Sequence, residues 1–151
     1  MSNNYGLNKY KQTSVTTASR GQILLMLYEA AIKNTKIAID ATMRRDLAEK
    51  GKYILKVQHI INELSLTLDH SANTPITGEL ERLYVYMIDQ ITDANIKCDP
   101  IPLRTVLKLL ETLYDGWKGA VDQVNKNGGD AASLAKSETI TANPLTKPDK
   151  K

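Results

Sequence analysis

The sequence predicts an all-α protein, an antiparallel up-and-down four-helix bundle in a single domain. Apolar residues recur at helical spacing in four long segments, and no stretch of comparable length alternates as a β-strand does. Each segment opens with a helix-capping signal, and the connections between segments are short. Short connections make successive helices antiparallel neighbours, and this is the arrangement of an up-and-down bundle.

The first two helices are each predicted to start at a capping box. Ser19 with Gln22, and Asp46 with Glu49, place a capping side chain three residues before a residue that can reach back. The first helix is expected over residues 20–44 and the second over residues 46–68.

The last two helices are each predicted to start at a proline. Thr74-Pro75 and Asp99-Pro100 combine a capping residue with proline at the first helical position, where its missing N–H costs nothing. We expect these helices to reach about Asn95 and Val124.

The two ends of the chain differ from the predicted bundle, which spans residues 19–125. Residues 1–18 are polar with scattered apolar side chains, and we interpret them as a segment that covers part of the bundle. Residues 126–151 contain Gly128-Gly129 and two prolines and lose helical periodicity. Such a segment buries too little apolar surface to offset its ordering entropy, so we predict a disordered tail.

Composition and charge exclude several classes of protein. The net charge of the 151 residues is only +3, and acidic and basic residues alternate, which argues against a nucleic-acid-binding stripe. No apolar run is long enough for a membrane span, and no signal peptide is evident. Cys98 is the single cysteine, so no internal disulfide forms. We expect a cytoplasmic protein.

Residues with catalytic or metal-binding chemistry are scarce. His59 and His70 are the only histidines, and the glycine-rich loops that bind phosphates or dinucleotides are missing. His59 is expected at a helix edge, His70 in a solvated loop, and Cys98 as a small residue at a helix end. The sequence therefore predicts no enzyme, no cofactor and no metal site.

The first helix carries more apolar surface than a bundle core needs. Its residues 23–28 are six apolar side chains in a row, which at 100° per residue surround the helix completely. Three partner helices cover one side only, and a helix that is apolar all round must be covered on every side. Residues 1–18, a second copy of the chain and a partner protein are three candidates for the remaining cover.

The second and third helices also have apolar residues beyond one core stripe. In the second helix the expected stripe includes Tyr53, while Ile54, Leu55 and Leu66 widen it. In the third helix Val85 and Tyr86 lie off the expected stripe, and Tyr84 lies on it.

Several motifs together resemble the flagellar secretion chaperone (FliS) family. They occur in order over about residues 5–124, with helical spacing intact. The residues that carry the resemblance are Tyr10, Val15, Thr17-Ala18-Ser19, Leu25-Met26-Leu27-Tyr28, Ile60-Ile61-x-Glu63-Leu64, Leu83-Tyr84-x-Tyr86-Met87, Ala94-Asn95 and Trp117.

The resemblance implies a function and its partners. Members of the family fold as antiparallel four-helix bundles and bind the C-terminal helical region of flagellin in the cytosol. Binding prevents premature polymerisation and delivers flagellin to the cytoplasmic domain of the flagellar type III export gate. The resemblance places Tyr10 and Val15 in the covering segment, and it suggests as groove or groove-supporting residues Leu27, Tyr28, Leu83, Tyr86 and Met87.

Two alternatives to an export chaperone stay open at this point. The first is a self-associating structural protein, a homodimer in which another copy covers the apolar surface. The second is a helical enzyme or metal protein, which the small number of candidate ligands disfavours.

Overall fold

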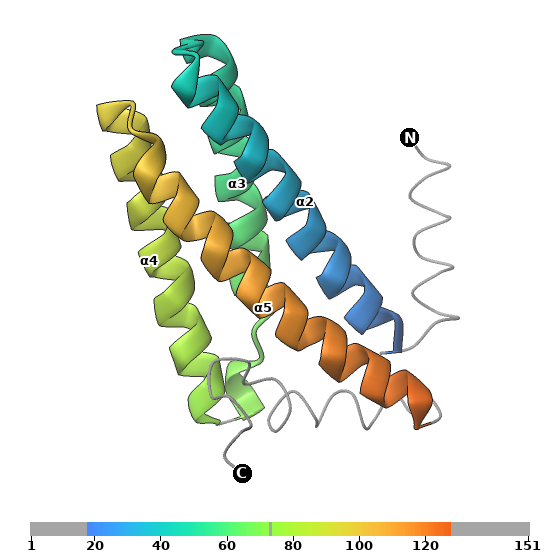
Figure 1. Cartoon of the computed structure of the whole chain (residues 1–151). Coiled ribbons are helices and arrows are strands. Elements are labelled where there is room, and N and C mark those ends of the chain that lie inside the picture. Colours follow the sequence, from blue (N-terminus) through green and yellow to red (C-terminus); the bar gives the residue numbers. More distant parts are fainter. Residues whose placement is uncertain (1–17, 73, 128–151) are drawn as a thin grey trace, which may run out of the picture.

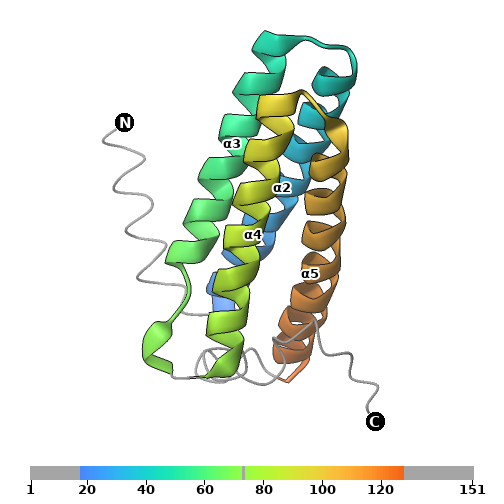
Figure 2. The ribbon, with the colours of Figure 1, turned by 90° about the vertical axis from the view of Figure 1, so that its left-hand side faces the viewer.

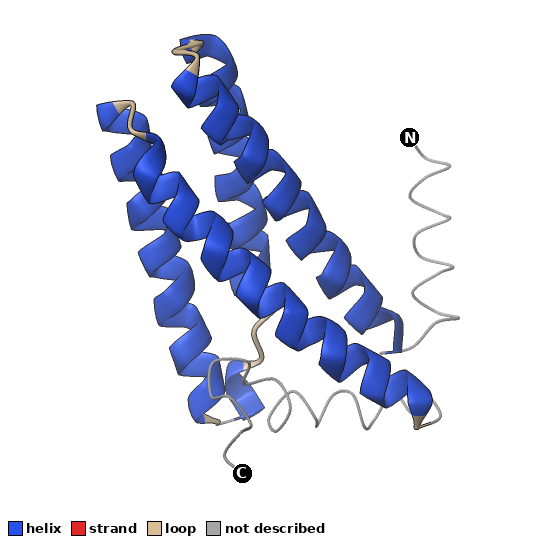
Figure 3. Ribbon diagram, in the orientation of Figure 1, coloured by secondary structure: helices blue, strands red, loops and turns tan. Residues whose placement is uncertain are grey.

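The computed structural model describes residues 18–72 and 74–127, which form four α-helices that alternate in direction (Figure 1). No strand occurs in these ranges (Figure 3). The prediction of an all-α four-helix bundle is confirmed. The helices are α2 (Ala18–Met43), α3 (Leu47–Leu66), α4 (Pro75–Lys97) and α5 (Pro100–Lys126).

The four helices form a ring in which each has two neighbours. α2 packs against α3 and α5, and α4 packs against the same two helices from the other side (Figure 2). The backbones of α2 and α4 lie diagonally opposite and make no close approach. Each helix therefore has one side toward the core and one side facing out of the ring.

Two of the predicted helix starts are confirmed by their hydrogen bonds. The Asp46 carboxylate accepts a 3.1 Å hydrogen bond from the Glu49 N–H, and the Asp99 carboxylate accepts a 3.0 Å bond from the Ile101 N–H. Thr74 precedes α4 as predicted, but its side chain makes no capping hydrogen bond. The carboxylates of Asp46 and Asp99 thus satisfy backbone N–H groups that have no partner within the first helical turn.

Other boundaries differ from the prediction by one or two residues. α2 begins at Ala18 and so already contains Ser19, which is therefore not its N-cap. α3 ends at Leu66, two residues early, because the chain turns into a short 3₁₀-helix, η1 (His70–Ala72). The Asp69 carboxylate accepts a 3.0 Å hydrogen bond from the Ser71 N–H and so supports that turn.

The α2–α3 and α4–α5 corners share one geometry at the same end of the bundle (Figure 1). Arg45 and Cys98 have φ values of 59° and 52°, and a helix-capping aspartate follows each of them. The N–H of that aspartate bonds to a carbonyl five residues back, at Ala41 (2.9 Å) or Ala94 (3.0 Å). Such a left-handed residue lets a helix stop and reverse within three residues.

A buried lysine ties the two corners together. Lys50, in the first turn of α3, is only 7% exposed, and its ammonium donates a 2.9 Å hydrogen bond to the Asn95 carbonyl in the last turn of α4. The carbonyls of a last helical turn have no partner within the helix, so the lysine satisfies one of them.

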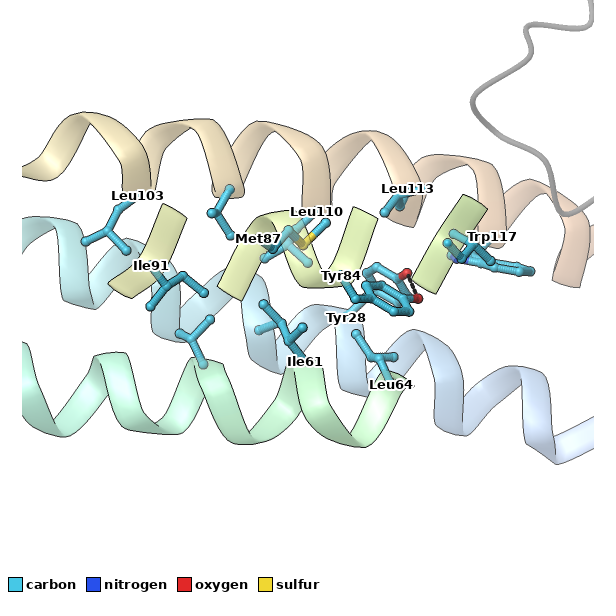
Figure 4. Packing of buried hydrophobic residues seen from close by; sticks show 14 of the residues in the cluster. Tyr28, Ile61, Leu64, Tyr84, Met87, Ile91, Leu103, Leu110, Leu113 and Trp117 are labelled. Carbon is cyan, nitrogen blue, oxygen red and sulfur yellow. Dashed lines mark hydrogen bonds between the residues drawn. The ribbon is translucent and has the colours of Figure 1, made fainter. Parts of the chain in front are cut away.

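The core includes one polar layer that joins the diagonal helices (Figure 4). The hydroxyls of Tyr28 in α2 and Tyr84 in α4 lie 2.5 Å apart. Burial raises the pKa of Tyr84 to about 12 and that of Tyr28 well above its usual value. The indole nitrogen of Trp117 lies beside this pair, is buried, and has no hydrogen-bond acceptor of normal geometry among the described residues.

The core-facing stripe of α3 was predicted one residue out of phase at its start. Ile54 is 1% exposed and belongs to the core, whereas Tyr53 is only partly buried at its edge. Two lysines, Lys52 and Lys56, place their ammonium groups 5.4 and 4.9 Å from the centre of the Tyr53 ring. A tyrosine suits this edge position because its ring packs on the core while its face meets cations.

Candidate functional site

The six apolar residues at the start of α2 divide between core and surface. Leu25 and Tyr28 are buried, Leu24 and Leu27 are partly buried, and Ile23 and Met26 are 53% and 62% exposed. The neighbouring helices α3 and α5 therefore cover one side of this run, as expected. Two large apolar side chains remain on the outward side.

These two residues belong to a longer stripe along the outward side of α2. Ile23, Met26, Ala30, Lys33 and Ile37 follow one another at steps of three and four residues and are all at least partly exposed. We call these five residues the outer α2 face. Steps of three and four define the seam by which one helix packs against another in a coiled coil.

A hollow of about 500 Å³ adjoins the outer α2 face, between α2 and α5. Its apolar and aromatic lining residues are Ile32, Ile37 and Tyr114, and its charged lining residues are Glu29, Lys33 and Lys36. The Tyr114 hydroxyl donates a 2.7 Å hydrogen bond to the Glu29 carboxylate, which raises the pKa of Tyr114. This bond joins α5 to α2 at the hollow. It also engages the carboxylate of Glu29, the acidic residue of the lining.

The free charge at this hollow is positive. Lys33 makes no ion pair with any described residue, and the Lys36 ammonium lies 3.9 Å from the Glu111 carboxylate, with both side chains about half exposed. Exposed pairs of that length hold each other weakly. An apolar floor with lysines at its rim suits an amphipathic helix that carries acidic residues beside its apolar stripe.

The described side chains with metal-binding chemistry do not cluster. Among residues 18–72 and 74–127, no three His, Cys, Asp or Glu side chains are placed to hold a metal ion. His59 is exposed on α3, and His70 is exposed with its ring nitrogen 4.0 Å from the Glu81 carboxylate. Both histidines thus lie where the sequence placed them.

Two of the groove residues suggested by the family resemblance lie in the core. Tyr28 and Met87 have no exposed surface. Neither side chain can touch a partner in a groove. Of the two suggested roles, lining the groove or supporting it from the core, only the second is compatible with this burial. Both residues follow the core stripe because their helical positions point into the ring.

The other suggested residues do not converge on one groove. Leu27 is partly buried on α2, whereas Leu83 is partly buried and Tyr86 is 45% exposed on α4. Because α2 and α4 are not neighbours, these side chains cannot line one groove between adjacent helices. Tyr10 and Val15 lie outside the described residues. So do the predicted covering segment and the predicted tail, except for residue 18 in α2 and residues 126 and 127 at the end of α5.

Most of the residues at the hollow were not predicted from the sequence. Lys33 and Ile37 were detectable, because with Met26 and Ala30 they repeat the three-and-four spacing along a segment already predicted to be helical. Tyr114 of α5 was not detectable in this role, because its contact with Glu29 joins residues 85 positions apart.

None of the helices in the described part of the chain has the length and hydrophobicity that a membrane crossing requires.

The sequence is similar to a protein family and to several characterised proteins. The family described as "Flagellar protein FliS" matches residues 1–124. The flagellar secretion chaperone FliS of Bacillus subtilis is 32% identical over 126 residues, covering 83% of this chain and 93% of that protein. The flagellar secretion chaperone FliSB of Pseudomonas aeruginosa is 32% identical over 117 residues, covering 75% and 93%. The flagellar secretion chaperone FliS of Salmonella typhimurium is 31% identical over 118 residues, covering 75% and 87%.

The family match covers all four helices except the last two residues of α5, and it includes the segment that carries the outer α2 face. The chain therefore belongs to the FliS family of flagellar secretion chaperones.

Proposed function

We propose that this chain is a cytosolic export chaperone that binds the C-terminal helical region of flagellin. It prevents premature polymerisation and hands flagellin to the cytoplasmic domain of the flagellar type III export gate. Among the structural observations, the proposal rests on the outer α2 face, an outward stripe of apolar residues at coiled-coil spacing with a hollow beside it. Membership of the FliS family, whose relatives are named flagellar secretion chaperones, supports the choice of a flagellar client.

The outer α2 face matches what a client helix needs. Ile23 and Met26 are more than half exposed, and burying such a side chain completely contributes roughly 1.5–3 kcal/mol. A client helix with an apolar stripe covers these residues, and its own apolar surface is buried in the same contact. Hiding that surface prevents the client from assembling too early.

Charge at the rim adds a preference among client segments. Lys33 and Lys36 line the hollow, and no described carboxylate holds either of them tightly. A client segment with acidic residues beside its apolar stripe gains from these lysines, and a basic segment is repelled. Exposed charges of this kind act mainly on association rate and specificity, and salt weakens them.

Calorimetry with a peptide from the flagellin C-terminal region tests the proposal. If the peptide folds as a helix on the outer α2 face, binding shows a negative heat-capacity change and circular dichroism shows a gain in helix. The absence of both heat and helix gain would contradict the proposed function.

Two charge-introducing variants then test the location. Met26→Glu places a carboxylate in the stripe and should weaken peptide binding by at least about tenfold, which corresponds to about 1.4 kcal/mol. Ile101→Glu is a matched control, because Ile101 is 66% exposed on α5 outside the outer α2 face. Equal losses from both variants would move the binding site elsewhere.

A further inference from the structure

The three methionines among the described residues lie in three different environments. Met87 has no exposed surface, whereas Met26 and Met43 are 62% and 59% exposed. A peroxide oxidises methionine by direct contact with its sulfur, so burial protects the side chain and exposure makes it available. Met26 and Met43 are therefore the two described methionines that an oxidant in solution reaches.

Met43 differs from Met26 in what its sulfur contacts. The Arg104 guanidinium donates a hydrogen bond to the Met43 sulfur, and the nitrogen lies 2.9 Å from it. A sulfur lone pair held by a cation is less available to an oxidant, because the positive charge withdraws electron density from it. The Met26 sulfur accepts no hydrogen bond from any residue that the structure describes. By exposure and by contact together, Met26 is the most reactive of the three.

Met26 also occupies the centre of the apolar part of the outer α2 face. Ile23 lies one turn before it and Ala30 one turn after it, and both are at least partly exposed. A client helix that covers Ile23 and Ala30 cannot avoid the side chain between them. A chemical change at Met26 therefore acts directly on the surface that the client contacts.

We propose that Met26 is an oxidation site and that its sulfoxide weakens client binding, an inference that rests on the proposed function. The oxidant is a peroxide, here represented by hydrogen peroxide. The Met26 sulfur attacks one peroxide oxygen, the O–O bond breaks and an S–O bond forms. The second oxygen leaves as water with both protons, so the sulfur is oxidised and the peroxide is reduced.

This oxidation changes binding and leaves the fold intact. On the free chain the new oxygen of Met26 faces water, so the core loses no contact. In the complex an apolar client stripe displaces that water and offers no hydrogen-bond donor in its place. Burying a polar group without a hydrogen bond is unfavourable, so the oxidised face binds the client more weakly.

The change at Met26 is reversible. A methionine sulfoxide reductase converts the sulfoxide back to the thioether, while two of its thiols form a disulfide and the oxygen leaves as water. The outer α2 face then regains its apolar stripe. Oxidation and reduction of one side chain thus give the chaperone two states, which bind the client tightly and weakly.

Mass spectrometry after brief treatment of the full chain with dilute hydrogen peroxide tests the site. Met26 should be modified fastest, Met43 more slowly, and Met87 not at all while the chain is folded. Arg104→Ala removes the cation from the Met43 sulfur and should speed modification of Met43 alone. Modification of Met26 no faster than that of Met87 would overturn the proposal.

Calorimetry with the flagellin C-terminal peptide, added after the peroxide has been removed, tests the effect. The oxidised wild-type chain should bind at least about tenfold more weakly than the untreated chain, and reductase treatment should restore its affinity. Met26→Leu keeps an apolar side chain of similar size without sulfur, so peroxide should not change the affinity of this variant from its own starting value. Met43→Leu is the matched control and should lose affinity on oxidation as the wild type does. Circular dichroism checks that every treated chain is folded.

Two results would overturn the effect and leave the proposed chaperone function standing. One is unchanged peptide affinity in a chain whose Met26 is fully oxidised. The other is an equal loss of affinity on oxidation in the Met26→Leu and wild-type chains. An untreated chain that does not bind the peptide contradicts both proposals, and this outcome is distinguishable because it precedes any oxidation.

Discussion

At the scale of single residues, the paired hydroxyls of Tyr28 and Tyr84 make a hydrogen bond that crosses the core between the diagonal helices α2 and α4. Each ring fills apolar space, and one hydroxyl donates its proton to the oxygen of the other. Removing one hydroxyl leaves its partner buried without a hydrogen bond, which costs more than the bond itself contributes. Removing both hydroxyls removes that penalty.

A double-mutant cycle measures this coupling. Tyr28→Phe and Tyr84→Phe should each lower the free energy of unfolding by roughly 1–3 kcal/mol, the desolvation cost of an unpaired hydroxyl. The double variant should lose clearly less than the sum of the two single losses. Chemical denaturation of all four proteins gives the numbers. Strict additivity would mean that the two hydroxyls do not stabilise each other.

At the scale of helices, the two corners show how the ring is closed. Both reverse the chain through one residue in the left-handed region, followed by a capping aspartate. Neither left-handed residue is glycine, so each corner carries backbone strain that its aspartate cap and carbonyl bonds offset. The caps were predictable from Asp46 and Asp99. The positions of positive φ were not, because glycine, the usual residue there, is absent from both.

Replacing the left-handed arginine with glycine should relieve that strain. Arg45→Gly should raise the free energy of unfolding by up to about 1 kcal/mol, since relief of about 1–2 kcal/mol exceeds the entropic cost of a more flexible unfolded chain. Arg45→Val should lower it, because a β-branched side chain tolerates positive φ poorly. Thermal unfolding of the three proteins checks this order. A less stable glycine variant would show that Arg45 contributes through its side chain instead.

At the scale of the whole molecule, the closed ring decides which residues are core and which are surface. Met87 has no exposed surface, whereas the adjacent Tyr86 is 45% exposed, because one residue turns the helix by 100°. The family resemblance suggested both as groove or groove-supporting residues. Only the position of α4 within the ring separates them.

Substitution with glutamate distinguishes the two positions. Met87→Glu should abolish cooperative unfolding, because an unpaired buried charge costs a large part of the 5–15 kcal/mol by which a domain is stable. Tyr86→Glu should remain folded, with a change in the unfolding free energy within about 1 kcal/mol. Circular dichroism during heating compares them. A folded Met87→Glu protein would place Met87 at a surface.

Much of this structure was predictable because its determinants are local. Helical periodicity, the capping carboxylates of Asp46 and Asp99 and the proline at the start of α4 depend on residues a few positions apart. The surplus of apolar residues around the first helix also follows from local spacing, and its exposed Ile23 and Met26 confirm that expectation.

Only the tertiary structure decided how these surfaces are assembled. The Glu29–Tyr114 bond, the Lys50–Asn95 bond and the Tyr28–Tyr84 pair join residues 85, 45 and 56 positions apart, and no local pattern specifies such partners. The ring order of the helices set Tyr28 and Met87 in the core and separated Leu27 from Tyr86. The sequence alone determined that apolar surface is in excess, because the helical spacing of the apolar residues shows more of them than one core-facing stripe can hold. Packing alone determined where that surface remains uncovered, because burial depends on which helices become neighbours.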